Sequence, residues 1–225
     1  VYAHLFIGGE AEISLRDGVF RLVQETGYPW NGKVRFRLEA KPGESFPTQS
    51  FTLGIRIPGW ATSAVTSLCG ACAEPAAVSA GGYARFERVW QPGDAVTLDL
   101  DLKPRFVTAH PSVRADIGKV ALQYGPLVYC FEQADNGANL PAIALRTDMA
   151  PAATFEPALL GGVVSLAVAG LRTTEAGWEA GELYRTLPAG GELFEETPVA
   201  LKAVPYYAWN NRGIGEMAVW LRAKR

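Results

Sequence analysis

Apolar and polar residues alternate one by one along several segments of this chain, and that alternation restricts the fold more than any other feature. Val34, Phe36 and Leu38 alternate with charged residues, and the same pattern recurs in 51–57 and 96–102. A period of two places the apolar side chains on one face of a strand. One-faced strands are typical of antiparallel sheets with one solvated side. Because no segment keeps a helical period for three turns, we expect an all-β fold.

Turn sequences such as Pro58-Gly59 and Pro92-Gly93 separate these strands. A second block then follows, in which the segment 120–132 is apolar nearly throughout and broken only at Gly125-Pro126. Two strands that meet at a bend would produce this pattern, at least one of them buried on both faces. We therefore expect two antiparallel β-sandwich, jelly-roll-like domains, 1–105 and 106–225, in a chain of 225 residues.

Three finer expectations concern the second block. The proline-containing stretch 103–111 is interpreted as the linker between the domains. Residues 133–198 have weaker patterning, which indicates short strands joined by solvated loops. The segment 216–221 alternates again, and it is predicted to be the last strand, with Met217 on one face and Trp220 on the other.

Composition excludes several partners and leaves the compartment largely open. The net charge is -2 and no basic stripe is present, so we expect no nucleic-acid partner. No apolar run reaches the roughly 18 residues of a membrane span, so we expect no membrane partner. The first residues, 1–7, are typical of a strand inside a longer chain and not of a signal peptide. Three cysteines leave at least one free thiol, which favours a reducing compartment such as the cytoplasm.

Residues with reactive side chains are few and have simpler interpretations. Cys69 and Cys72 have Cys-x-x-Cys spacing, but they lie between β segments, without the helix N-terminus that lowers the thiol pKa in redox motifs. We interpret them as turn cysteines, with a disulfide between them as the alternative. Glu132 and Asp135 resemble a glycosidase carboxylate pair, but a strand end and an Asp-Asn-Gly turn are the favoured explanation for them. We therefore assign no catalytic residue and no metal ligand.

Aromatic residues provide the remaining functional signal. The candidate interface or sugar-stacking residues are Tyr28, Trp30, Trp60, Tyr206, Tyr207, Trp209 and Arg212. Core packing is the competing interpretation for each ring, because sandwich cores use the same residues. The segment 206–213 combines aromatic and polar residues, so it is expected either to form an interface or to fill the second domain with Trp209. Arg212 is expected to stack on Trp209 or to pair with a carboxylate.

Several short sequence motifs of this chain occur together in one known family. They are the segments Thr26–Gly32, Leu53–Trp60, Gly81–Tyr83 with Arg88–Trp90, Gly125–Tyr129 and Pro205–Gly213. In this order they resemble the C-terminal part of glycoside hydrolase family 127, the β-L-arabinofuranosidase-type enzymes. The resemblance covers almost the whole chain, apart from the segment 133–198.

The resemblance implies that two β-sandwich domains follow an (α/α)6 catalytic barrel. In the family the barrel holds a zinc ion, a cysteine nucleophile and a glutamate acid/base. None of these positions has a counterpart in this sequence, so zinc is expected in the missing barrel and no cofactor in this chain. The parent is implied to be a bacterial retaining glycosidase, and this chain its inactive accessory region.

The expected partner is therefore the protein's own N-terminal catalytic barrel. A second copy of the chain, in a homodimer, and carbohydrate are further candidate partners. The alternative function is a carbohydrate-binding module that uses exposed aromatic rings.

Overall fold

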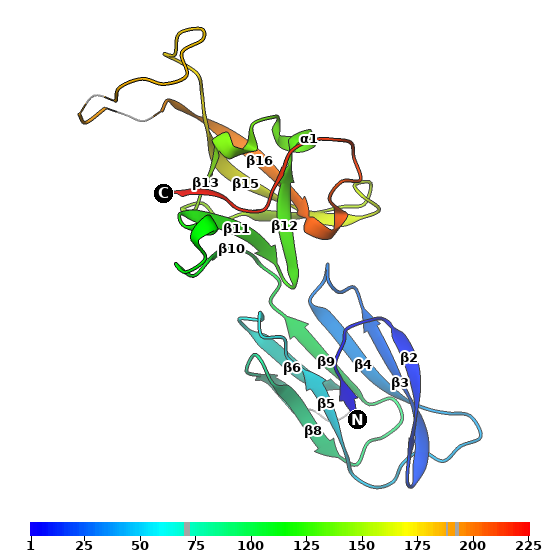
Figure 1. Cartoon of the computed structure of the whole chain (residues 1–225). Helices are drawn as coiled ribbons and strands as arrows, with labels where there is room; N and C mark the ends of the chain where they lie inside the picture. Colours follow the sequence, from blue (N-terminus) through cyan, green and yellow to red (C-terminus); the bar gives the residue numbers. More distant parts are fainter. Residues whose placement is uncertain (70–72, 188, 192–193) are drawn as a thin grey trace. The chain divides into compact units, whose positions relative to one another are not determined.

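The computed structural model describes the chain except residues 70–72, 188 and 192–193, and describes 69 and 73–77 by their backbone alone. The chain divides into two compact units, Val1–Leu102 and Lys103–Arg225 (Figure 1). The expected all-β fold is confirmed, since the described helices are four short turns: α1 (Gln133–Asn136), η1 (Arg114–Asp116), η2 (Leu140–Ala142) and η3 (Tyr206–Ala208). Within the described part, no helix is long and apolar enough to cross a membrane.

The first unit contains two sheets. Its strands are β1 (Tyr2–Ala3), β2 (Gly9–Leu15), β3 (Gly18–Thr26), β4 (Lys33–Ala40), β5 (Phe51–Arg56), β6 (Ala64–Cys69), β7 (Ala73–Ala77), β8 (Tyr83–Arg88) and β9 (Ala95–Leu100). The smaller sheet has the order β1-β5-β8, and the larger has the order β2-β3-β4-β9-β6-β7. The segments that alternate in sequence, β4, β5 and β9, are strands as expected.

Both sheets of the first unit contribute side chains to one core. Phe36 and Leu98 from the larger sheet and Leu53 and Ile55 from the smaller sheet are fully buried in the same cluster. Trp90 is also buried there, and its indole nitrogen donates to the Phe51 carbonyl at 3.0 Å. The strands are therefore held by burial of one face, as the alternation predicts.

The second unit is built from a single nine-stranded sheet. Its strands are β10 (Pro104–Thr108), β11 (Lys119–Tyr124), β12 (Leu127–Glu132), β13 (Ile143–Arg146), β14 (Ala152–Glu156), β15 (Val163–Thr173), β16 (Glu196–Pro205), β17 (Met217–Ala218) and β18 (Leu221–Lys224). The path runs β10-β11-β18-β13-β15-β16-β12-β17, with β14 on β15. Because β11 also pairs with β12, the strands β11, β18, β13, β15, β16 and β12 form a closed, barrel-like ring.

Some details of the second unit agree with the sequence prediction and others do not. β11 and β12 meet at Gly125, which has a φ of 53°, and four consecutive residues of β12 are buried, as expected. The stretch predicted as linker instead contains β10, which pairs along β11. The predicted last strand is two strands, β17 on β12 and β18 on β11 and β13. The segment 133–198 was predicted to form only short strands, but it contains β15, which has 11 residues.

Candidate functional site

The loop that follows β16 has a defined backbone conformation. It begins with η3, whose Ala208 is buried against the second unit. Asn210 adopts the left-handed region, with a φ of 66°, a conformation that asparagine tolerates better than most residues. The side-chain nitrogen of Asn211 donates to the Ala208 carbonyl at 3.0 Å. The loop 206–213 is therefore a fixed turn.

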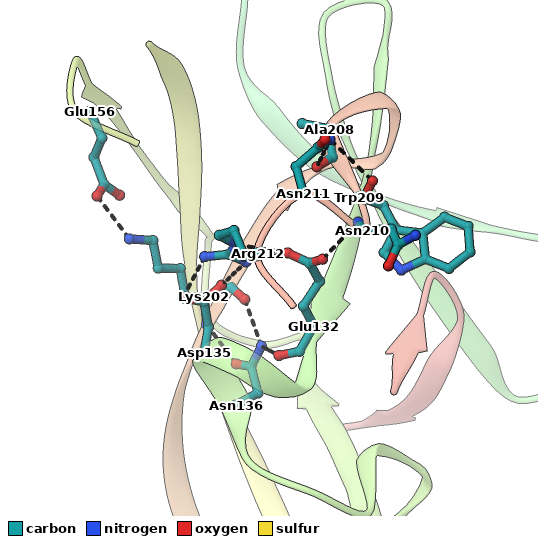
Figure 2. A network of polar contacts seen from close by, with 10 residues as sticks. All are labelled: Glu132, Asp135, Asn136, Glu156, Lys202, Ala208, Trp209, Asn210, Asn211 and Arg212. Atoms are coloured by element: carbon teal, nitrogen blue, oxygen red, sulfur yellow. Dashed lines mark hydrogen bonds and ion pairs between the residues drawn. The ribbon is translucent and has the colours of Figure 1, made fainter. Parts of the chain in front are cut away.

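Arg212 attaches this loop to the end of β12. Its Nε donates to Glu132 Oε2 at 3.0 Å, and its Nη1 donates to Asp135 Oδ1 at 3.0 Å. Nη2 contacts Glu132 Oε2 and lies 2.5 Å from Asp135 Oδ2. The backbone N–H of Asn210 donates to the other Glu132 oxygen, Oε1, at 3.1 Å. Figure 2 shows the Arg212 side chain directed at both carboxylates, with the Trp209 ring turned away from it.

These charges lie in a partly dehydrated position. The side chains of Arg212 and Glu132 are 18% and 7% exposed. The hydrogen bond with Asp135, followed by that with Glu132, raises the pKa of Arg212 against the opposing effect of desolvation. Both carboxylates are thus committed to a permanent cation. A carboxylate held in this way is poorly placed to act as a glycosidase acid or nucleophile, because its oxygens already accept strong hydrogen bonds.

A second group of polar contacts supports the same end of the sheet. Asn136 donates to the backbone carbonyls of Glu132 and Lys202 at 2.9 and 2.8 Å, and accepts from the Lys202 N–H at 2.9 Å. The Lys202 side chain pairs with Glu156 at 2.8 Å, and this hydrogen bond is the largest cause of a lowered Glu156 pKa. β12, α1, β14 and β16 are therefore connected by hydrogen bonds that surround Arg212 (Figure 2).

The aromatic residues of the loop are exposed. The rings of Tyr206 and Trp209 stack with centroids 6.1 Å apart and an interplanar angle of 13°. Trp209 is 41% exposed, and Tyr206 and Tyr207 are exposed as well. Trp209 therefore does not fill the core of the second unit, and the charged Arg212 cluster lies beside a small aromatic surface.

The other candidate aromatic residues belong to the first unit and are half-buried. Tyr28 stacks on Trp60 with centroids 6.4 Å apart and meets the edge of Phe6 at 5.2 Å. Tyr28 and Trp60 both pack on the core, and desolvation raises the Tyr28 pKa. Trp30 is half-buried in the turn between β3 and β4. Core packing therefore accounts for much of the surface of Tyr28 and Trp60.

The cysteines and metal ligands complete the candidate chemistry. Residues 70–72 and the side chain of Cys69 lie outside the described residues. The interpretation of Cys69 and Cys72 as turn cysteines therefore stays a prediction. Cys130 is buried, and burial raises the pKa of its thiol to about 12. Among the residues that the structure describes, no group of three His, Cys, Asp or Glu side chains could hold a metal ion. The zinc that the family resemblance implies therefore finds no donor set among them.

The sequence interpretation missed that Glu132, Asp135 and Arg212 form one cluster. Asp135 and Arg212 are separated by 77 residues, and the two acids were interpreted separately as a turn and a strand end. One signal was available. An arginine in an aromatic loop and a glutamate that ends a buried strand both require a partner of opposite charge.

Two family models match the chain along nearly its full length. The model described as "Beta-L-arabinofuranosidase, GH127 middle domain" matches residues 1–102. The model described as "Glycoside hydrolase family 127 C-terminal domain" matches residues 104–222. The two matches meet at the boundary between the two compact units.

Individual relatives agree with the family models. A non-reducing end β-L-arabinofuranosidase of Bifidobacterium longum subsp. longum is 35% identical over 99% of this chain and 33% of its own length. The crystal structure of a GH127 β-L-arabinofuranosidase from Geobacillus stearothermophilus T6 is 40% identical, with a TM-score of 0.85, over 99% of this chain and 33% of that protein. A structure titled "Glycoside hydrolase" is 32% identical, with a TM-score of 0.84, and is covered over 36% of its length. The chain spans about a third of these relatives, and it belongs to glycoside hydrolase family 127, as that family's middle and C-terminal domains.

Proposed function

We propose that this chain is the non-catalytic accessory region of a longer bacterial β-L-arabinofuranosidase-type glycoside hydrolase. Its role is to support the catalytic barrel, which binds zinc and lies in the part of the parent protein outside this chain. The proposal draws on the two named relatives, which are β-L-arabinofuranosidases about three times as long as the region they share with this chain.

The observation that carries the proposal is the state of the carboxylates at the end of β12. Glu132 and Asp135 are the acidic pair that most resembles glycosidase machinery, and Arg212 holds both of them. A glycosidase acid must release a proton to the leaving group, and its partner must attack the sugar or activate water. A pair locked to one guanidinium is suited to fixing the loop 206–213, which presents Tyr206 and Trp209 to a partner.

The test compares this chain with the full-length protein encoded by the gene. We expect the full-length protein to hydrolyse an aryl β-L-arabinofuranoside and this chain alone to show no turnover. Turnover by this chain alone that is lost in Glu132→Gln or Asp135→Asn would overturn the proposal. An inactive full-length protein with no helical barrel before Val1 would also overturn it.

The loop 206–213 can be tested separately with two tryptophan variants. Trp209→Ala is expected to lower the unfolding free energy of this chain far less than a core substitution, because the ring is partly exposed and fills no core position. Trp90→Ala is the matched control, and it should cost about 3–5 kcal/mol because it empties a core position. In the full-length protein, Trp209→Ala is expected to weaken assembly or activity. A large loss of stability in the Trp209→Ala chain would contradict the docking role.

A carbohydrate-binding module is the second candidate function. The observation that favours it is the exposed Tyr206–Trp209 stack, because aromatic faces are common platforms for sugar rings. Affinity electrophoresis on arabinan or arabinogalactan distinguishes the two functions. Retardation of the chain that disappears in Trp209→Ala would favour the binding module, and unretarded migration would favour the accessory role.

A further inference from the structure

The outer face of the smaller sheet in the first unit has an unusual composition. Leu53 and Ile55 of β5 point into the core, so their neighbours Gly54 and Arg56 point outward. β1 runs parallel to β5 and places Tyr2 opposite Gly54. Tyr83 begins β8 opposite Arg56. We use the name β1 face for the exposed Tyr2, His4 and Tyr83 together with the exposed Leu5 and Ile7, which follow β1 in the chain.

Three rings on the β1 face form a fixed cluster. Tyr2 meets the edge of Tyr83 with centroids 5.4 Å apart, and it stacks on His4 at 6.3 Å. His4 Nδ1 and the Tyr83 hydroxyl are joined by a hydrogen bond of 2.7 Å. Gly54 allows this arrangement, because a Cβ there would lie 2.4 Å from the Tyr2 ring. The cluster is therefore ordered before any partner binds.

The segment after β1 holds two aliphatic side chains in water. Leu5 and Ile7 are 62% and 71% exposed. Their backbone is fixed, because the Gln24 side chain donates to the Leu5 and Ile7 carbonyls at 3.0 and 2.9 Å. Single exposed aliphatic residues are ordinary, but two of them directly after a ring cluster in the chain favour an interaction surface.

The outer face of the larger sheet shows what a solvated face looks like in the same unit. Charged side chains follow one another across β2, β3 and β4 in the pairs Arg21–Glu10, Arg21–Glu39, Arg37–Glu25 and Lys41–Glu12. Such a ladder of ion pairs is typical of a face exposed to water. The β1 face differs from it in adding aromatic and aliphatic side chains to a sheet face that also bears the charged Arg56, Arg85 and Glu87.

We propose that the β1 face is the surface on which the part of the parent protein preceding this chain docks. The inference rests on the proposed function, because it takes its occupant from the two-thirds of the relatives' length that this chain does not cover. The family model that matches residues 1–102 describes a middle domain, and a segment that precedes a middle domain would be joined to it next to β1. Covalent attachment raises the effective concentration of the occupant, so a surface of this modest size is sufficient.

Hydroxyl-radical footprinting of the full-length protein and of this chain alone tests the inference. Residue-resolved mass spectrometry reports the oxidation of Tyr2, Leu5 and Tyr83, with the exposed Val65 of β6 as the reference. We expect the three β1-face residues to be oxidised several-fold less in the full-length protein, with Val65 unchanged. Equal oxidation in a catalytically active full-length protein would overturn the inference and leave the proposed function intact.

Two further outcomes distinguish this inference from docking of a second copy and from the proposed function. Protection that appears in this chain alone and grows with its concentration would show that a second copy covers the β1 face, which would also overturn the inference. A full-length protein that protects the β1 face but does not cleave arabinofuranosides would support docking and contradict the proposed function.

A variant pair provides an independent measurement. The double change Leu5→Asp and Ile7→Asp should shorten the half-life of full-length activity on heating several-fold, because it places charges in a buried interface. The melting temperature of this chain alone should hardly change, since both side chains are exposed in it. Val65→Asp is the matched control and should leave both measurements unchanged. Equal half-lives for the double variant and the control would count against the β1 face.

Discussion

At the scale of single residues, Arg212 determines the character of the loop 206–213. It bonds two carboxylates at once, and all three side chains are mostly removed from water. Removing one member of such a cluster leaves the opposite charge buried without compensation. The contribution of Arg212 to stability is therefore best measured by removing its side chain, and an exposed ion pair provides the comparison.

Arg212→Ala is expected to lower the free energy of unfolding by about 3 kcal/mol, because Glu132 would remain buried as an unpaired anion. Arg146→Ala is the matched control. The Arg146–Asp148 pair is also bidentate but lies open to solvent, so little change is expected. Urea unfolding of the two variants measures the difference. Equal unfolding free energies would show that the buried cluster contributes no more than a surface pair.

Cys130 provides a second prediction at this scale. Burial raises its thiol pKa to about 12, so the native protein keeps the thiol neutral where an unfolded chain would release the proton. The stability contributed by Cys130 is present below about pH 8.5, the ordinary thiol pKa, and decreases as the pH rises from there toward 12. Iodoacetamide is expected to label Cys130 only when the second unit unfolds. Rapid labelling in the native state, measured on the Cys130 peptide, would contradict this.

At the scale of secondary-structure elements, the predictable strands are those with one solvated face. β4 and β9 have alternating exposure, and their sequences show it directly. β15 was interpreted as short strands because its buried residues include the small Ser165 and Gly170, which conceal any period. The split of the last strand into β17 and β18 depends on partners more than 70 residues away. Patterning within one segment contains no information about such partners.

Gly32 tests how tightly two predicted strands approach each other. A Cβ at this position would lie 1.9 Å from the Leu100 carbonyl oxygen, where β4 begins beside the end of β9. Gly32→Ala is expected to destabilise the first unit by about 1–3 kcal/mol, because the obstacle is backbone. Gly59→Ala has open space around the new methyl group and is the control. Thermal unfolding that is the same for both variants would contradict the predicted steric clash.

The same reasoning applies to the candidate site. The composition of 206–213 predicted either an interface or a segment that fills the second domain with Trp209, and the partial exposure of Trp209 favours the first. A carboxylate partner for Arg212 was one of the two predicted alternatives, but Glu132 and Asp135 could not be identified as that partner, because the contact requires β12 and the loop after β16 to meet. The parallel pairing of β13 with β18 is a further long-range contact that alternation alone does not predict.

At the scale of the whole molecule, the two units differ in whether their strands form open sheets or a closed ring. The first unit has two separate sheets, whereas the ring of the second unit closes through the pairing of β11 with β12. β18 lies within that ring, between β11 and β13. The ring of the second unit therefore closes only once its last strand is in place, whereas the last strand of the first unit, β9, lies between β4 and β6 of an open sheet.

Deleting residues 221–225 is expected to open the ring and to unfold most of the second unit, because β11 and β13 would both lose a partner and the buried Leu221 would be removed. Deletion of Arg225 alone is the control, since this residue belongs to no strand. Amide hydrogen exchange measures the result. Continued protection of β11 and β13 in the longer deletion would contradict the prediction.

The position of β18 also sets an order of events during synthesis. The ribosome delivers the first unit before the second, and domains fold as units once they have emerged. All strands of the first unit are available by Leu100, whereas the ring of the second unit lacks a member until Lys224 has been added. Newly synthesised β11 and β13 thus keep unpaired the edges that β18 will occupy until the rest of the chain is translated. A stop codon before Leu221 would release a protein whose first unit can fold and whose second unit is still open.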